Sequence, residues 1–179
     1  MIERRTYPLE IRTARGNPRR LEGYAATFGA EARIGDFVET IRQGAFADSL
    51  AAGRDILALV DHDPTRVLGR TRSGTLRLGE DARGLQFSVD LPDTQAARDV
   101  LALAERGDIG GMSFGFDVED DGDEWTGQKR ELRKVNLHEI SVVSAWPAYD
   151  GTIVQTRSAL APGFVTRNLA RRYLDTLRG

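Results

Sequence analysis

The sequence predicts an α+β fold that is rich in β-structure, with mostly antiparallel strands and a few flanking helices. Two observations carry this prediction. Short runs with strand-like composition recur along the chain between turn residues, whereas only two longer segments have the period of an amphipathic helix. The 179 residues are enough for one domain with a buried core. We expect that domain over residues 1–154, a linker over 155–163 and a helical tail over 164–179.

The first half of the chain alternates between strand-like runs and turn signals. Gly and Pro within residues 15–18 predict the turn of an opening hairpin. A short helix over 45–52 ends at Gly53, and the continuous apolar run 56–60 has the length of a buried strand. The strands expected in this half lie at residues 4–12, 19–28, 56–60, 67–71, 75–78 and 85–91, and residues 37–41 are expected to form a short strand or a loop.

The second half contains the clearest helix, over residues 94–106. Thr94 is placed to cap its start, and Gly107 ends it. Residues 117–124 hold six acids in eight positions, which predicts a solvated loop. A second amphipathic helix is expected over 164–177, in the C-terminal tail, and its apolar face needs a partner. The strands expected in this half lie at residues 109–118, 130–135 and 137–144.

Composition excludes several classes of protein. Hydrophobic residues make up 40% and charged residues 29% of the chain, as in soluble globular proteins. No apolar run approaches the ~20 residues that span a bilayer, and the charged N-terminus does not resemble a signal peptide. Without cysteine, and with only His62 and His138, we expect no metal site and no cofactor. The net charge of −2 disfavours nucleic acid as a partner.

His62 is the first candidate for chemistry. It follows the predicted buried strand 56–60 and is flanked by Asp61 and Asp63. Strand ends are common places for functional residues, and a histidine is the usual general base near neutral pH. The alternative interpretation is an exposed histidine in an acidic turn.

The sequence GMSFG at residues 111–115 matches G-x-S-x-G. In α/β-hydrolases this motif lies at a strand-to-helix turn, whereas here a predicted helix precedes the motif and strand-like residues follow it, so we reject that fold. Ser113 remains a candidate nucleophile, and the N–H groups of Gly110, Gly111 and Met112 are candidate oxyanion donors. The alternative is a glycine-rich β-bulge whose serine is merely small.

A third candidate lies in the strand 137–144. Glu139 is a charged residue within a largely apolar strand, and a carboxylate can orient a catalytic imidazole such as that of His62. His138 competes for the same role. Both could instead be polar residues on a half-exposed strand. The chain order histidine, serine, acid matches none of the common serine-protease orders, so spacing alone does not establish a triad.

Several blocks of the sequence, taken together and in order, resemble the prohead (capsid-maturation) serine proteases of tailed bacteriophages. The fold of those proteases is related to herpesvirus assemblin. The resemblance covers residues 21–152. The matching blocks are GYAATF at 23–28, IRQGAF with SL at 41–50, LVDHD at 59–63, GLQF at 84–87, GMSFGF at 111–116, and LHEISVV with PAY at 137–149.

The resemblance implies an assemblin-like barrel and a serine endopeptidase. Ser113 would be the nucleophile, His62 the general base and Glu139 the third member, with His138 as the alternative. The substrate would be the scaffold-like segment of the major capsid protein, cut inside the immature capsid in the host cytoplasm, and the enzyme would also process itself. By analogy with assemblin we expect self-association as a dimer. A non-catalytic assembly or scaffolding protein with the same fold is the main alternative, and a small β-barrel binding module is a further one.

Overall fold

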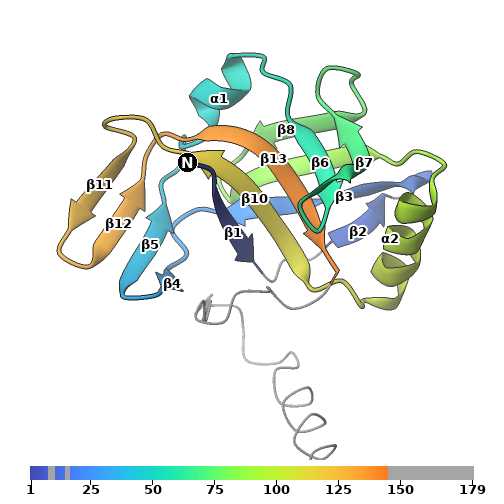
Figure 1. Cartoon of the computed structure of the whole chain (residues 1–179), viewed down its shortest axis with the longest axis horizontal. Coiled ribbons are helices and arrows are strands. Elements are labelled where there is room, and N and C mark those ends of the chain that lie inside the picture. The colour runs from blue at the N-terminus through green and yellow to red at the C-terminus, as the bar shows by residue number, and fades with distance from the viewer. Residues whose placement is uncertain (8–10, 15–16, 145–179) are drawn as a thin grey trace, which may run out of the picture.

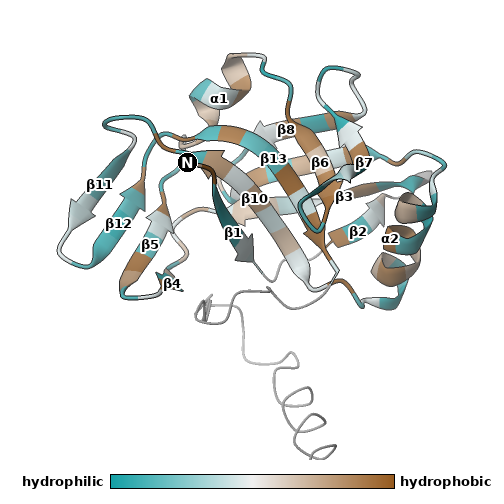
Figure 2. Cartoon of the chain, viewed as in Figure 1, coloured by the Kyte–Doolittle hydropathy of each residue, from teal (hydrophilic) through white to brown (hydrophobic). Residues whose placement is uncertain are grey.

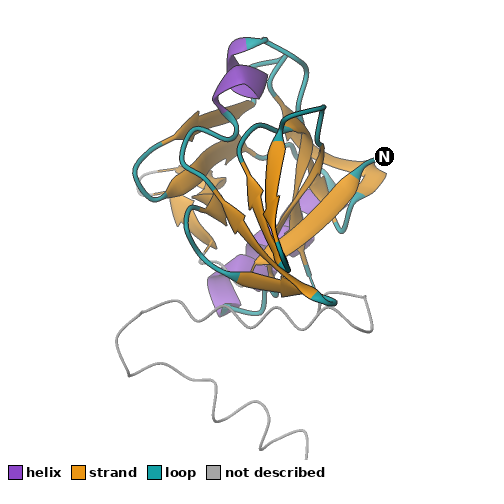
Figure 3. Cartoon of the chain, turned by 90° about the vertical axis from the view of Figure 1, so that its left-hand side faces the viewer, coloured by secondary structure: helices purple, strands orange, loops and turns teal. Residues whose placement is uncertain are grey.

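The computed structural model describes residues 1–7, 11–14 and 17–144, and these residues form thirteen strands and two helices (Figures 1 and 3). The helices are α1 (Ala47–Ala51) and α2 (Gln95–Arg106). The strands are β1 (Glu3–Tyr7), β2 (Ile11–Ala14), β3 (Asn17–Thr27), β4 (Ala32–Ile34), β5 (Phe37–Ile41), β6 (Leu57–Val60), β7 (Asp63–Arg70), β8 (Leu76–Glu80), β9 (Gly84–Asp90), β10 (Gly111–Asp117), β11 (Asp123–Thr126), β12 (Lys129–Leu132) and β13 (Asn136–Val143).

The described strands pair into three sheets. The largest has the order β1-β10-β13-β6-β7, and the others have the orders β11-β12-β5-β4 and β2-β3-β9-β8. Pairing is antiparallel except between β13 and β6 and between β12 and β5. The β-rich, mostly antiparallel class is therefore confirmed. The expected closed barrel is not found among the described residues, because the hydrogen-bonded order of each sheet ends at two edge strands instead of closing on itself.

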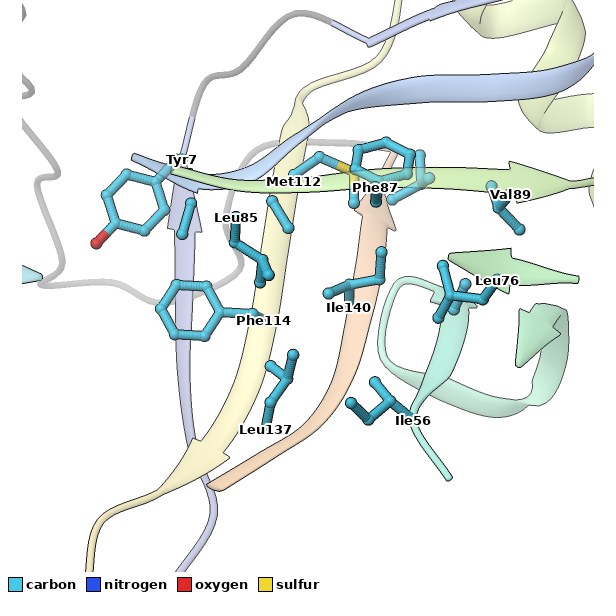
Figure 4. Close-up of a cluster of buried hydrophobic side chains, with 14 of the residues drawn as sticks. Tyr7, Ile56, Leu76, Leu85, Phe87, Val89, Met112, Phe114, Leu137 and Ile140 are labelled. Atoms are coloured by element: carbon cyan, nitrogen blue, oxygen red, sulfur yellow. The ribbon is translucent and has the colours of Figure 1, made fainter. Parts of the chain in front are cut away.

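The core lies where the inner face of the largest sheet meets β9 (Figure 4). Along β10 the side chains alternate between faces, so Phe114 points into this core while Ser113 points to the other face. The ring of Tyr7 on β1 stacks on Phe114 with centroids 6.0 Å apart, and Phe46 meets Phe114 edge-on at 5.4 Å. These aromatic contacts fix β10 and β1 against the rest of the domain.

Five charged side chains form a second, largely buried feature, which we call the ion-pair cluster: Glu3, Arg5, Glu39, Asp123 and Arg130. Arg5 binds both carboxylate oxygens of Glu39 at 2.6 and 2.9 Å. Arg130 binds Glu3 at 2.7 and 2.9 Å, Asp123 at 2.6 Å and Glu39 at 3.1 Å. The cluster therefore joins β1 to the β11-β12-β5-β4 sheet, on the opposite face of β1 from Thr6.

Helix α2 follows the sequence prediction closely. The Thr94 side chain accepts a hydrogen bond from the N–H of Ala97, and Gly107 ends the helix in the left-handed conformation at φ 73°. Ala97 and Val100 are buried on one face, as the apolar spacing predicts. None of the described helices is long and apolar enough to cross a membrane.

Other element predictions need correction. The single strand expected over residues 4–12 is two strands, β1 and β2, which belong to different sheets. The acidic run 117–124 is not wholly a loop, because β11 begins within it and forms a hairpin with β12. Much of this hairpin is hydrophilic (Figure 2), so its strands lack the apolar alternation that marks a strand in sequence. Strand β4 has only three residues and was not predicted.

The opening hairpin is confirmed, since β2 and β3 pair antiparallel. The expected linker and helical tail lie outside the described residues, and the domain boundary at residue 154 stays a prediction.

Candidate active site

His62 occupies a tight turn between two strands of the largest sheet. Asp61 and His62 connect β6 to β7, and both have positive φ angles, 51° and 60°. Two-residue hairpin turns need this left-handed conformation, which non-glycine residues adopt only at an energetic cost. The end of β13 stabilises the turn: the Asp61 N–H donates to the Val142 carbonyl at 2.9 Å, and the Asp61 carboxylate accepts from the Ser144 N–H at 2.8 Å. The turn is thus held in one place relative to β13.

The imidazole of His62 is hydrogen-bonded to Glu139. The His62 Nδ1 atom lies 2.6 Å from Glu139 Oε1. The second carboxylate oxygen, Oε2, accepts a hydrogen bond from the Ser141 hydroxyl at 2.6 Å, and the same hydroxyl oxygen accepts from the His62 backbone N–H at 3.3 Å. Arg4 is the nearest cation, with Nε 3.9 Å from Glu139 Oε1. Because each of its carboxylate oxygens is hydrogen-bonded, Glu139 fixes the orientation of the His62 ring. The other ring nitrogen of His62, Nε2, is not bound to Glu139.

The Glu139 side chain can lie against the neighbouring strand β10 because residue 115 is a glycine. Gly115 on β10 pairs directly with Glu139 on β13. A Cβ atom at position 115 would come within 2.5 Å of Glu139 Oε1, closer than real side-chain contacts allow. The second glycine of the G-x-S-x-G pattern therefore makes room for the carboxylate.

Ser113 lies on the same face of the sheet as Glu139 and Ser141. It pairs across the ladder with Ser141 on one side and with Thr6 of β1 on the other. Its side chain is fully buried, and its hydroxyl donates a hydrogen bond of 2.9 Å to the backbone carbonyl of Arg5. Among the described residues no hydrogen bond joins Ser113 to His62.

His138, the alternative third member, has a different partner. Its Nε2 atom is hydrogen-bonded to the carboxylate of Asp117 at the end of β10. Hydrogen bonds from Asn136 and His138 hold the pKa of Asp117 below its ordinary value. The described geometry thus brings Glu139, and not His138, to His62.

The candidate oxyanion donors lie at the start of β10. The N–H of Gly110 donates to the Val143 carbonyl at 2.9 Å, and Gly111 pairs with Val143 in the same ladder. Met112 is buried, with Tyr7 and Val142 as its ladder partners. The assignment of these three N–H groups to an oxyanion hole stays a prediction.

Sequence reasoning missed two residues that build the site. No role is assigned to Ser141 from the sequence, although its period-two spacing from Glu139 is a usable signal. Asp61 is likewise assigned none, although its carboxylate accepts hydrogen bonds from both the N–H and the hydroxyl of Ser144. No sequence signal links residues 61 and 144, because that contact depends on the parallel pairing of β6 with β13.

A serine, a histidine and a carboxylate brought together on one sheet face are the residue types used by serine hydrolases. In the described part of the chain, no group of three or more histidine, aspartate or glutamate side chains is arranged to hold a metal ion. The model of a family described as the caudovirus prohead serine protease matches residues 7–162. The chain belongs to this family. No curated protein and no solved structure matches the chain.

Proposed function

We propose that the chain is a serine endopeptidase that cleaves the scaffold-like segment of the major capsid protein, and itself, inside the immature phage head. The observation that carries the proposal is the 2.6 Å contact between His62 and Glu139 on the sheet face that also presents Ser113. Membership of the prohead serine protease family supports the same reaction.

The proposed mechanism assigns one step to each residue. The Ser113 oxygen attacks a substrate carbonyl carbon, and His62 accepts the serine proton at Nε2 and then donates it to the leaving amine. Glu139 keeps the proton of His62 on Nδ1 and stabilises the imidazolium that forms. For this step the Ser113 hydroxyl has to turn from the Arg5 carbonyl toward His62.

Confinement in the capsid would let such a protease act without tight binding of its substrate. A protease sealed in a shell with its substrate has a very high effective substrate concentration, so each site needs little binding energy. Self-association as a dimer is part of the proposal by analogy with assemblin.

A non-catalytic scaffolding protein with the same fold is the second candidate. The observation that favours it is the full burial of Ser113 and its hydrogen bond to Arg5. The presence of both Ser113 and His62, with Glu139 bound to His62, favours the enzyme instead.

Co-expression with the cognate major capsid protein distinguishes the two. We expect the wild type to shorten the capsid protein and Ser113→Ala to leave it full length, as read by intact mass. Because the enzyme could require an assembled shell, the comparison is repeated on purified proheads. If the capsid protein stays full length in both settings with both variants, the protease proposal is rejected.

A further inference from the structure

Strand β1 lies at the edge of the largest sheet, beside β10, the strand that carries Ser113 (Figure 1). It runs antiparallel to β10, with Thr6 directly opposite Ser113. The hydrogen-bond partner of the Ser113 hydroxyl is the carbonyl of Arg5, 2.9 Å away. The candidate nucleophile is therefore in contact with a peptide carbonyl of an extended strand, and its side chain is fully buried.

The edge of β10 has the properties of a peptide-binding site. Extended peptides commonly bind by adding a strand to a sheet edge, where main-chain hydrogen bonds give affinity and alternate side chains give specificity. Four of the five residues of β1 precede residue 7, where the family match begins. The peptide groups of an added strand lie near the plane of the sheet, whereas the Ser113 side chain stands off its face. Ser113 can thus approach a carbonyl of that strand from above its plane.

The contacts of the Arg5 side chain indicate which type of residue the edge of β10 would prefer in a bound peptide. It binds both oxygens of Glu39, a side chain that is fully buried. If β1 left the edge, Glu3 would leave with it, and two carboxylates, Glu39 and Asp123, would face the single guanidinium of Arg130. The vacated position would then have a net charge of −1. Such a position favours a cation, and the fork of an arginine matches the carboxylate geometry best.

We propose that the edge of β10 is the peptide-binding site and that β1 occupies it as an intramolecular substrate strand, with an arginine before the scissile bond. This inference rests on the proposed function. In β1 the scissile bond is Arg5–Thr6. The Ser113 oxygen bonds to the Arg5 carbonyl carbon while its proton passes to His62. The carbon–nitrogen bond then breaks as that proton moves to the Thr6 nitrogen, and water hydrolyses the resulting ester to free Ser113 and a carboxylate on Arg5.

A synthetic peptide with the sequence of residues 1–10, MIERRTYPLE, tests the inference. The full-length chain is incubated with millimolar peptide, and the products are identified by mass. We expect cleavage between Arg5 and Thr6 by the wild type and none by Ser113→Ala. The substitutions that test the arginine preference are made in the peptide, so those results do not depend on whether an enzyme variant folds.

Matched peptide substitutions test the arginine preference. Arg5→Gln in the peptide should slow cleavage by about 100-fold, because a site built for a charged hydrogen-bonding group rejects an analogue that lacks it. Arg4→Gln is the control, and its rate should stay within about threefold, because Arg4 is half exposed and its contact with Glu139 is long.

Two results would overturn the inference and leave the proposed function standing: the capsid protein is cleaved but the peptide is not, or the Arg5→Gln peptide is cleaved as fast as the original. If wild type and Ser113→Ala leave both substrates intact, the proposed function and this inference are both rejected.

Discussion

The ion-pair cluster and the His62–Glu139 site both place charges inside a β-rich domain, but they bind those charges differently. In the cluster, the single side chain of Arg130 contacts three carboxylates, and Arg5 binds both oxygens of Glu39. In the site, each oxygen of Glu139 has one close partner, and one of those partners is a histidine. Histidine is the side chain that gains and loses a proton near neutral pH, whereas arginine is always charged in proteins.

This difference separates a structural role from a chemical one. Burial would lower the pKa of Arg130, but the hydrogen bonds that Arg130 donates to Glu3 and Asp123 outweigh it and hold that pKa above its ordinary value. Arg130 therefore stays charged, and its hydrogen bonds hold β1 and β12 together. Changes in the site should accordingly alter rate with little effect on stability, whereas changes in the cluster should lower stability.

The largest expected effect is that of Glu139→Gln on rate. The amide keeps the shape of the side chain but no longer carries the charge that stabilises the imidazolium of His62, so we expect kcat for capsid-protein cleavage to fall by about 10³- to 10⁴-fold. The free energy of unfolding should change by only about 1 kcal/mol. His138→Ala is the control, since His138 binds Asp117 and should leave kcat nearly unchanged. The opposite ranking of these two variants would make His138 the third member.

The second largest expected effect is a loss in the free energy of unfolding. Arg130→Met removes a buried guanidinium and leaves Glu3 and Asp123 without their main partner, so we expect a loss of roughly 3–5 kcal/mol in the free energy of unfolding. Urea denaturation monitored by circular dichroism measures it. Arg133→Met is the matched control for Arg130→Met, because Arg133 pairs with Glu124 and Glu131 at a partly exposed position. This substitution should cost under about 1 kcal/mol in the free energy of unfolding. Equal losses in the two variants would show that the cluster has no special structural role.

The contact between Glu139 and His62 could be predicted from the sequence, whereas the ion-pair cluster could not. Period-two alternation puts Glu139 and Ser141 on one face of their strand, and the resemblance to the family named Ser113, His62 and Glu139. The cluster depends on β1 lying at the end of one sheet while β5 and β12 pair in parallel in another. These contacts join positions as far apart as residues 3 and 130, and nothing local in the sequence marks such a pairing.

The fold shows the same limit. Helix α2 was predicted almost to the residue, because a cap and a stop signal are local signals. The division of residues 4–12 into β1 and β2 was missed, although Pro8, a residue type disfavoured inside strands, lies between them in the sequence. The hairpin β11–β12 was missed because exposed strands carry the same charged residues as loops.

A smaller effect on rate is expected from Ser141→Ala. The substitution removes the hydrogen bond to Glu139 Oε2 and the acceptor of the His62 N–H, so the ring of His62 should be held less well. We expect kcat to fall by about tenfold with KM unchanged, which is the value of one charge-assisted hydrogen bond. Ser141→Thr keeps the hydroxyl and should restore most of the rate. An equal loss in both variants would indicate a packing defect instead of a positioning role.

The smallest expected effect is the acid sensitivity of β1. Burial alone would raise the pKa of Glu3, but hydrogen bonds from Arg130 and Arg5 outweigh it and hold that pKa below its ordinary value of 4.5. A carboxyl group with a lowered pKa in the folded state stabilises the protein above its unfolded pKa, and this contribution is lost as the pH falls through the folded pKa. Because Glu3 is partly exposed, we expect about 1 kcal/mol between wild type and Glu3→Gln at pH 7. That difference should shrink steadily below pH 4.5 in urea denaturation curves. A difference that stays constant down to pH 3 would mean that the charge of Glu3 does not hold β1. The charges that hold β1 in the cluster would then be those of Arg5, Glu39 and Arg130.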